Sequence, residues 1–129
     1  MKPSSKDLLA VAASGLWINA SEFFRNEVMV KSLWTEHYRT LGMDFPAAAV
    51  NGMMWGLWGF LLAAVVHVLL RRFSYGQTVL IVWVTAFVLM WIVIWNLNVM
   101  PAGLLWYALP LSLLEVAVAA WISRRLSPA

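Results

Sequence analysis

The chain of 129 residues contains no cysteine, which excludes disulfide bonds, thiolate nucleophiles and metal sites built on cysteine. Only 12% of the residues are charged, while 63% are hydrophobic. The sequence also lacks a nucleophile elbow, a phosphate-binding loop, a zinc-protease pair and a dinucleotide fingerprint. The composition therefore indicates a membrane protein, and the absence of a catalytic constellation makes an enzyme the less favoured interpretation without excluding one.

Two long apolar runs lie back to back in the middle of the chain. Residues 50–70 are apolar except for Asn51 and His67, and residues 78–97 are apolar except for two threonines and Asn96. Each run has the roughly 20 residues that a helix needs to cross a bilayer core. Because a membrane helix satisfies its own backbone hydrogen bonds, this pattern predicts a transmembrane hairpin that turns at residues 71–77.

Further apolar segments flank this hairpin. Residues 8–24 form a weaker span, for which a secretory signal peptide is the alternative, and residues 102–122 form a last span containing Pro110 and Glu115. Residues 25–49 form an outer segment, predicted as an amphipathic surface helix or an extension of the first helix, with Gly42 as its end. We therefore expect one all-α domain, an integral membrane four-helix bundle.

The basic residues predict the orientation. Three basic pairs, one near each end of the chain and one in the central turn, fall on the same side if there are four spans. These pairs are Lys2 and Lys6, Arg71 and Arg72, and Arg124 and Arg125. The positive-inside bias then places both termini in the cytoplasm. Topology explains the net charge of +3, so the partner is the lipid bilayer and no nucleic acid is expected.

Small residues form a stripe along the second predicted span. They are spaced 4, 3 and 4 residues apart, which places them on one helical face, and His67 continues the stripe. The stripe consists of Gly52, Gly56, Gly59 and Ala63. Small residues let two helix backbones approach closely, so the stripe predicts packing, self-association or docking onto a larger membrane protein.

Glu115 is the main candidate for a ligand or ion site. It shares a helical face with Ala108, Ser112 and Ala119, and lies nine residues before Arg124, or about 13 Å along the axis. A carboxylate at that depth costs several kcal/mol unless it is paired or protonated. Glu115 is thus either a site for a proton, a cation or a polar ligand group, or a protonated structural residue.

Other polar residues are weaker candidates. His67 is either linked to Glu115 or simply hydrated near the inner interface. Four residues are expected at the same outer depth, where they form either interhelical contacts or a site. They are Asn19, Glu22, Asn51 and Asn96.

A metal site is not expected, since His37 beside Glu36 supplies too few ligands, and no cofactor is indicated. The nine tryptophans are typical of residues that anchor a helix at the membrane interface.

The layout resembles uncharacterised small four-helix inner-membrane families of bacteria. The likeness lies in the short basic start, the segment SEFFRN at residues 21–26 and the final helix with LPLSLLE at residues 109–115. It implies the architecture and no function. Three classes of function stay open: an oligomerising or accessory module with a ligand or ion site between helices, a proton- or cation-coupled small-solute transporter using Glu115, and a membrane enzyme acting on lipid or quinone.

Overall fold

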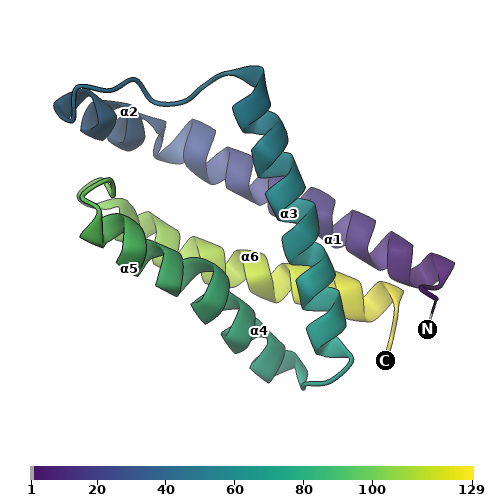
Figure 1. Ribbon diagram of the computed structural model, residues 1–129. Helices are drawn as coiled ribbons and strands as arrows, with labels where there is room; N and C mark the ends of the chain where they lie inside the picture. The colour runs from purple at the N-terminus through teal and green to yellow at the C-terminus, as the bar shows by residue number, and fades with distance from the viewer. Residues whose placement is uncertain (1) are drawn as a thin grey trace.

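The computed structural model describes residues 2–129, and within that range all regular secondary structure is helical. The helices are α1 (Ser5–Phe23), η1 (Phe24–Met29), α2 (Lys31–Thr40), α3 (Ala49–Leu70), α4 (Tyr75–Trp83), η2 (Val84–Val88), α5 (Leu89–Asn96) and α6 (Leu104–Leu126). The segments η1 and η2 are π-helical. α4, η2 and α5 follow one another without a break, so they form one long helix (Figure 1). The all-α prediction is confirmed.

Three helices are long and apolar enough to cross a membrane: α3, the continuous helix Tyr75–Asn96, and α6. These are the predicted central hairpin and the last predicted span. α1 is not among them, since Lys6, Asp7 and Glu22 all fall within its 19 residues. The last span begins later than predicted, because Gly103 adopts a φ of 82° that starts α6 at Leu104.

The outer segment contains both an extension of the first helix and a separate second helix. The first helix extends through η1 to Met29, and α2 follows as a separate helix after a break at Val30, whose φ and ψ are −122° and 14°. α2 ends at Thr40, two residues before Gly42, whose φ is 72°. A glycine in this left-handed conformation after the last helical turn is a common helix end, as the sequence predicted.

α1 packs against both α3 and α6, and the contact with α3 is very close at two glycines. A Cβ atom added to Gly59 of α3 would lie 2.6 Å from the Asn19 side chain of α1. A Cβ atom added to Gly15 of α1 would lie 2.3 Å from the Phe60 ring of α3. α4 is joined to α6 by the Tyr75 hydroxyl, which donates to the Ala117 carbonyl at 2.7 Å.

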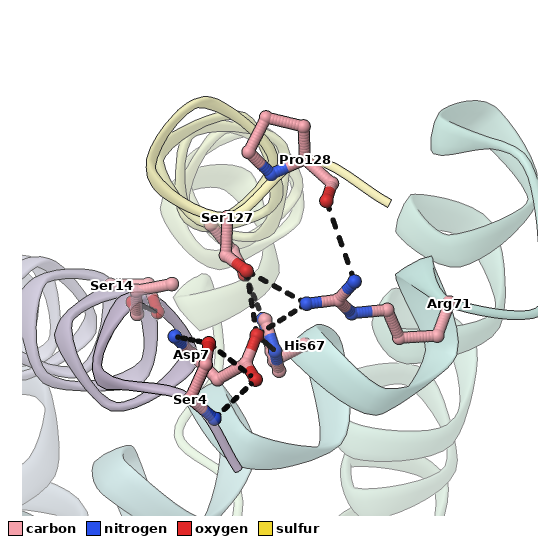
Figure 2. A network of polar contacts seen from close by, with 9 residues as sticks. Ser4, Asp7, Ser14, His67, Arg71, Ser127 and Pro128 are labelled. Carbon is pink, nitrogen blue, oxygen red and sulfur yellow. Dashed lines mark hydrogen bonds and ion pairs between the residues drawn. The ribbon is translucent and has the colours of Figure 1, made fainter.

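The two chain ends and the α3–α4 turn lie at the same end of the molecule (Figure 1). Asp7 of α1 accepts hydrogen bonds from Arg71, the C-cap of α3, and from Ser127, which follows α6. Figure 2 shows these contacts, which tie the ends of three helices together.

Candidate functional site

A buried cluster of three charged side chains lies between α1, η1 and α6. Glu115 of α6 is fully buried, and Glu22 and Arg25 are only 7% and 5% exposed. Arg25 forms an ion pair and a short hydrogen bond with Glu22 through Nη2. Its Nη1 atom lies 3.8 Å from Oε1 of Glu115. One guanidinium group therefore neighbours two buried carboxyl groups.

The two carboxyl groups differ in their hydrogen bonding. Glu22 accepts from Arg25 and, through Oε2, from Nδ2 of Asn26 at 2.9 Å. Neither carboxyl oxygen of Glu115 has a hydrogen-bond partner among the described residues, and neither does Nη1 of Arg25. A separation of 3.8 Å is too long for a hydrogen bond. Glu22 is thus hydrogen-bonded by two donors, whereas Glu115 has only the longer contact with Arg25.

The two π-helical segments of the described chain meet at this cluster. In η1 the Val30 amide donates to the Arg25 carbonyl at 3.0 Å, a bond that spans five residues. In η2 the Phe87 ring lies under the Arg25 guanidinium, 5.6 Å from its carbon atom to the ring centroid. This is within the range of a cation–π contact. Both irregular segments therefore help to position Arg25, in line with the frequent occurrence of π-bulges at functional sites.

Polar contacts extend from the cluster to α2. The Asn26 side chain donates to Glu22 and accepts from the Trp34 indole at 3.2 Å. Trp34 also packs near Phe45, with ring centroids 5.8 Å apart. The indole of Trp17 donates to the backbone carbonyl of Glu115 at 2.9 Å, which fixes that turn of α6 against α1. The outer helix α2 is thus attached to the buried site by side chains.

Asp7 is the centre of a second polar cluster, shown in Figure 2. Its Oδ2 atom accepts from the backbone and the hydroxyl of Ser4, at 2.8 and 2.9 Å. Its Oδ1 atom accepts from Ser127 Oγ at 2.6 Å, from Arg71 and from His67 Nε2 at 3.1 Å. Both carboxyl oxygens of Asp7 thus accept hydrogen bonds, and Arg71 supplies a neighbouring positive charge.

His67 bridges Asp7 and Ser123. Its Nδ1 atom lies 2.8 Å from Ser123 Oγ, and its Nε2 atom faces the Asp7 carboxylate. Because a carboxylate only accepts, Nε2 donates to Asp7, and Nδ1 shares a hydrogen bond with the serine hydroxyl. The order serine, histidine, aspartate occurs in hydrolases, but Ser123 is fully buried and cannot reach a substrate. Of the two alternatives for His67, no contact links it to Glu115, and it is buried against Asp7 and Ser123.

The structure does not bring the four predicted outer polar residues together. Asn19 donates to the carbonyls of Gly15 and Gly56, at 3.0 and 3.4 Å. Asn51 accepts from the backbone amide of Ala48 at 3.1 Å and so caps the start of α3. Asn96 is exposed at the end of α5, and Glu22 lies in the charged cluster.

Ser112, another predicted site residue, is fully buried and serves helix packing. Its hydroxyl accepts from the Trp83 indole at 3.0 Å and donates to the Ala108 carbonyl. Both hydrogen-bonding roles of the hydroxyl are thus filled by α4 and by α6 itself. This places Ser112 in the α4–α6 contact.

The glycine stripe of α3 divides into two parts. Gly59, Ala63 and His67 are buried, whereas Gly52 is exposed and Gly56 is half-buried. A Cβ atom added at Gly52 or Gly56 would meet nothing within 4 Å. The close packing expected within the chain therefore occurs at the inner half of the stripe, and the outer half is open.

Two residues of these clusters were missed by sequence reasoning. Arg25 was counted as one charge of a balanced outer segment, and Asp7 as part of a polar start. The spacing of Glu22 and Arg25 carried a usable signal, because residues three apart in a helix are neighbours on its surface. No local pattern relates Asp7 to Arg71 or Ser127, which are distant in the sequence.

A cavity of about 600 Å³ lies at the other end of the molecule, between α2 and the start of α6. Apolar residues such as Trp95, Pro101, Trp106 and Leu109 line most of it, together with His37. His37 Nε2 is already engaged with the Asn98 carbonyl at 2.9 Å. None of the predicted site residues lines this cavity.

The chain matches no family model, no curated protein and no solved structure. Its function must therefore be inferred from the buried charges and contacts described above.

Proposed function

We propose that this chain is a membrane transport protein that binds and releases a proton at Glu115. α1 and η1 together form a fourth span, so the four-helix bundle crosses a bacterial inner membrane. Both termini and the α3–α4 turn then lie in the cytoplasm, where the positive-inside bias places their basic residues. Contacts of Asp7 with Arg71 and Ser127 support this topology, since they hold all three segments at one end.

The observation that carries the proposal is the fully buried carboxyl group of Glu115, which has no hydrogen-bond partner and lies 3.8 Å from an arginine that is already bonded to Glu22. With both glutamates ionised, the cluster of Glu22, Arg25 and Glu115 has a net charge of −1. With one proton on Glu115, the cluster is neutral. A neutral cluster is strongly favoured in a low-dielectric interior. Glu115 therefore holds the proton until another change of charge compensates for its release. Such a group can bind and release a proton in each transport cycle.

The donor set fits a proton better than a metal ion. Within residues 2–129 no three histidine or acidic side chains form a group that could hold a metal. The positive charge of Arg25 also opposes a second cation beside Glu115, whereas a proton needs one carboxyl oxygen. Intramembrane acids that face a bundle interior are typical of proton relays in transporters.

Glu115→Gln is expected to abolish proton movement while leaving the fold intact. Glutamine keeps the shape and the hydrogen-bonding groups but removes the titrating proton. In proteoliposomes with a pH gradient, we expect the proton flux through the variant to fall at least about tenfold. Loss of an essential acid–base group lowers a rate by this much or more. Infrared difference spectra should also lose the carbonyl band of a protonated carboxylic acid.

The matched control is Glu36→Gln, because Glu36 is exposed on α2 with only a 4.0 Å contact to Arg39. It should carry wild-type flux. Wild-type flux in Glu115→Gln would refute the proton site, and so would an infrared spectrum with no protonated carboxyl group in the wild-type protein.

A second function is supported by the open outer half of the glycine stripe. We propose that Gly52 and Gly56 pack against a helix of a second copy or of a larger membrane protein, since a GxxxG pair with open space beside both glycines permits close backbone contact. Gly56→Leu should then weaken association, seen as a shift to monomer in crosslinking and light scattering in detergent. Under monomeric conditions its unfolding temperature should match the wild type, because a Cβ atom at Gly56 would meet nothing within 4 Å in the chain. An unchanged oligomeric state would contradict this role.

A further inference from the structure

Three exposed arginines at the end of the molecule that holds both termini have no acidic partner. Arg72, Arg124 and Arg125 are exposed, and none of them forms an ion pair with any residue of the described range 2–129. The two cations of the outer helix α2 differ from them, because each lies within 4.0 Å of a glutamate. The charge of the three arginines is therefore available to an anion from outside the chain.

Two of these arginines lie over aromatic rings where α4 meets α6. The guanidinium carbon of Arg124 lies 5.9 Å from the ring centroid of Tyr75 on α4, and that of Arg125 lies 5.5 Å from the ring centroid of Trp121. The Tyr75 hydroxyl donates to the Ala117 carbonyl, which holds this end of α4 against α6. Because residues three and four apart are neighbours on a helix, Trp121 lies beside both arginines. These four side chains form one surface, which we call the arginine–aromatic patch.

The arginine–aromatic patch continues into an apolar surface along α6. Trp121 is 53% exposed, and Leu114, seven residues earlier on the same helical face, is 54% exposed. Seven residues correspond to about 10 Å along the axis. The exposed surface thus changes from cationic to apolar along a helix that is long and apolar enough to cross a membrane. A phospholipid has the same order of groups, with a charged phosphate above an acyl chain.

We infer that the arginine–aromatic patch is a binding site for an anionic phospholipid. The lipid phosphate accepts hydrogen bonds from Arg124 and Arg125, while Trp121 and Leu114 contact the upper part of an acyl chain. Arg72, in the α3–α4 turn, adds a third positive charge at the same end. Guanidinium groups donate to phosphate in pairs, and basic surfaces between membrane helices bind acidic lipid headgroups. This inference concerns lipid binding and does not depend on the proton site at Glu115.

The positive-inside bias also accounts for basic residues at this end, but it makes a different prediction for lysine. Lysine satisfies that bias as well as arginine does. A paired contact with phosphate and stacking over an aromatic ring both depend on the planar guanidinium group. Changing Arg124 and Arg125 together to lysine therefore separates a lipid site from a topology signal.

The test compares an anionic and a neutral lipid with identical acyl chains. The full chain in detergent micelles is titrated with dioleoyl phosphatidylglycerol or dioleoyl phosphatidylcholine, and native mass spectrometry measures the bound lipid. We expect the wild type to prefer phosphatidylglycerol at least about tenfold, since each basic residue near a membrane surface contributes about fivefold to the attraction. The double variant Arg124→Gln/Arg125→Gln should lower this preference at least about fivefold. Arg124→Lys/Arg125→Lys should also lower it, despite its unchanged charge.

The matched control is Lys31→Gln/Arg39→Gln, which removes two cations whose side chains are 50% and 79% exposed on α2. It should keep the wild-type preference. The inference would be overturned if the wild type bound both lipids equally, if either double arginine variant kept the full preference, or if the control lost as much. Displacement of the lipid by inorganic phosphate, but not by chloride at equal ionic strength, would indicate a site for a soluble anion and would also overturn it. No pH gradient is used, so each of these outcomes leaves the proton site at Glu115 standing.

Discussion

Replacing Arg25 with leucine is expected to lower the free energy of unfolding by about 3–5 kcal/mol, the range seen when one partner of a buried ion pair is removed. Arg25 is 5% exposed and neutralises Glu22, which is itself 7% exposed. Without the guanidinium, Glu22 is left as a buried charge or takes up a proton at the expense of stability. The loss can be measured by denaturant unfolding in detergent, with tryptophan fluorescence as the signal.

Two variants sharpen this experiment. Arg39→Leu is the control, because its side chain is 79% exposed and its contact with Glu36 is 4.0 Å; an exposed pair of this kind contributes at most about 1 kcal/mol. Adding Glu22→Leu to Arg25→Leu should recover much of the loss, since no buried charge is then left unpaired. If Arg25→Leu is as stable as Arg39→Leu, the guanidinium is not buried and the proposed site is wrong.

Gly59→Leu is expected to have the second largest effect, a loss of about 1–3 kcal/mol or more, typical of overpacking a closely packed contact. Even a single Cβ atom at Gly59 would lie 2.6 Å from the Asn19 side chain. That side chain cannot move freely, because its amide donates to two backbone carbonyls, those of Gly15 and Gly56. The helix pair α1–α3 must therefore separate. The same unfolding measurement detects the loss.

Gly52→Leu is the control for Gly59→Leu, since both lie on α3 and both lose the flexibility of glycine in a helix. A Cβ atom at Gly52 meets nothing within 4 Å, so this variant should unfold like the wild type. Equal stability of the two variants would show that α1 does not pack on α3 as described.

The position of α1 in the bundle depends on these same contacts. Lys6, Asp7 and Glu22 make it the least apolar of the long helices, and it is not among the three that are apolar enough by composition to cross a membrane. Asp7 is satisfied at one end by Arg71 and Ser127, and Glu22 near the other by Arg25. Polar groups that are paired inside a bundle are tolerated in a membrane, so α1 can form the fourth proposed span.

Hydropathy and turn chemistry were enough to predict the all-α class, the central hairpin and the last long helix. These features depend on the chain locally: a run of about 20 apolar residues predicts a helix whatever its neighbours are. The end of α2 near Gly42 was predictable for the same reason, because a glycine with positive φ ends a helix through its own backbone conformation. Spacing also indicated that Glu115 faces a packed interior, and it is fully buried.

Tertiary structure alone decided which polar groups meet. Helical spacing placed Glu22, Asn19 and Glu115 on the correct faces, but the partner of Glu115 depends on how α6 lies against α1. The pairing of Asp7 with Arg71 and Ser127 joins residues more than 60 positions apart. No periodicity within one helix predicts such a contact. The two halves of the glycine stripe differ for the same reason: the sequence defines a face, and only the crossing of α1 over α3 determines which part of it is covered.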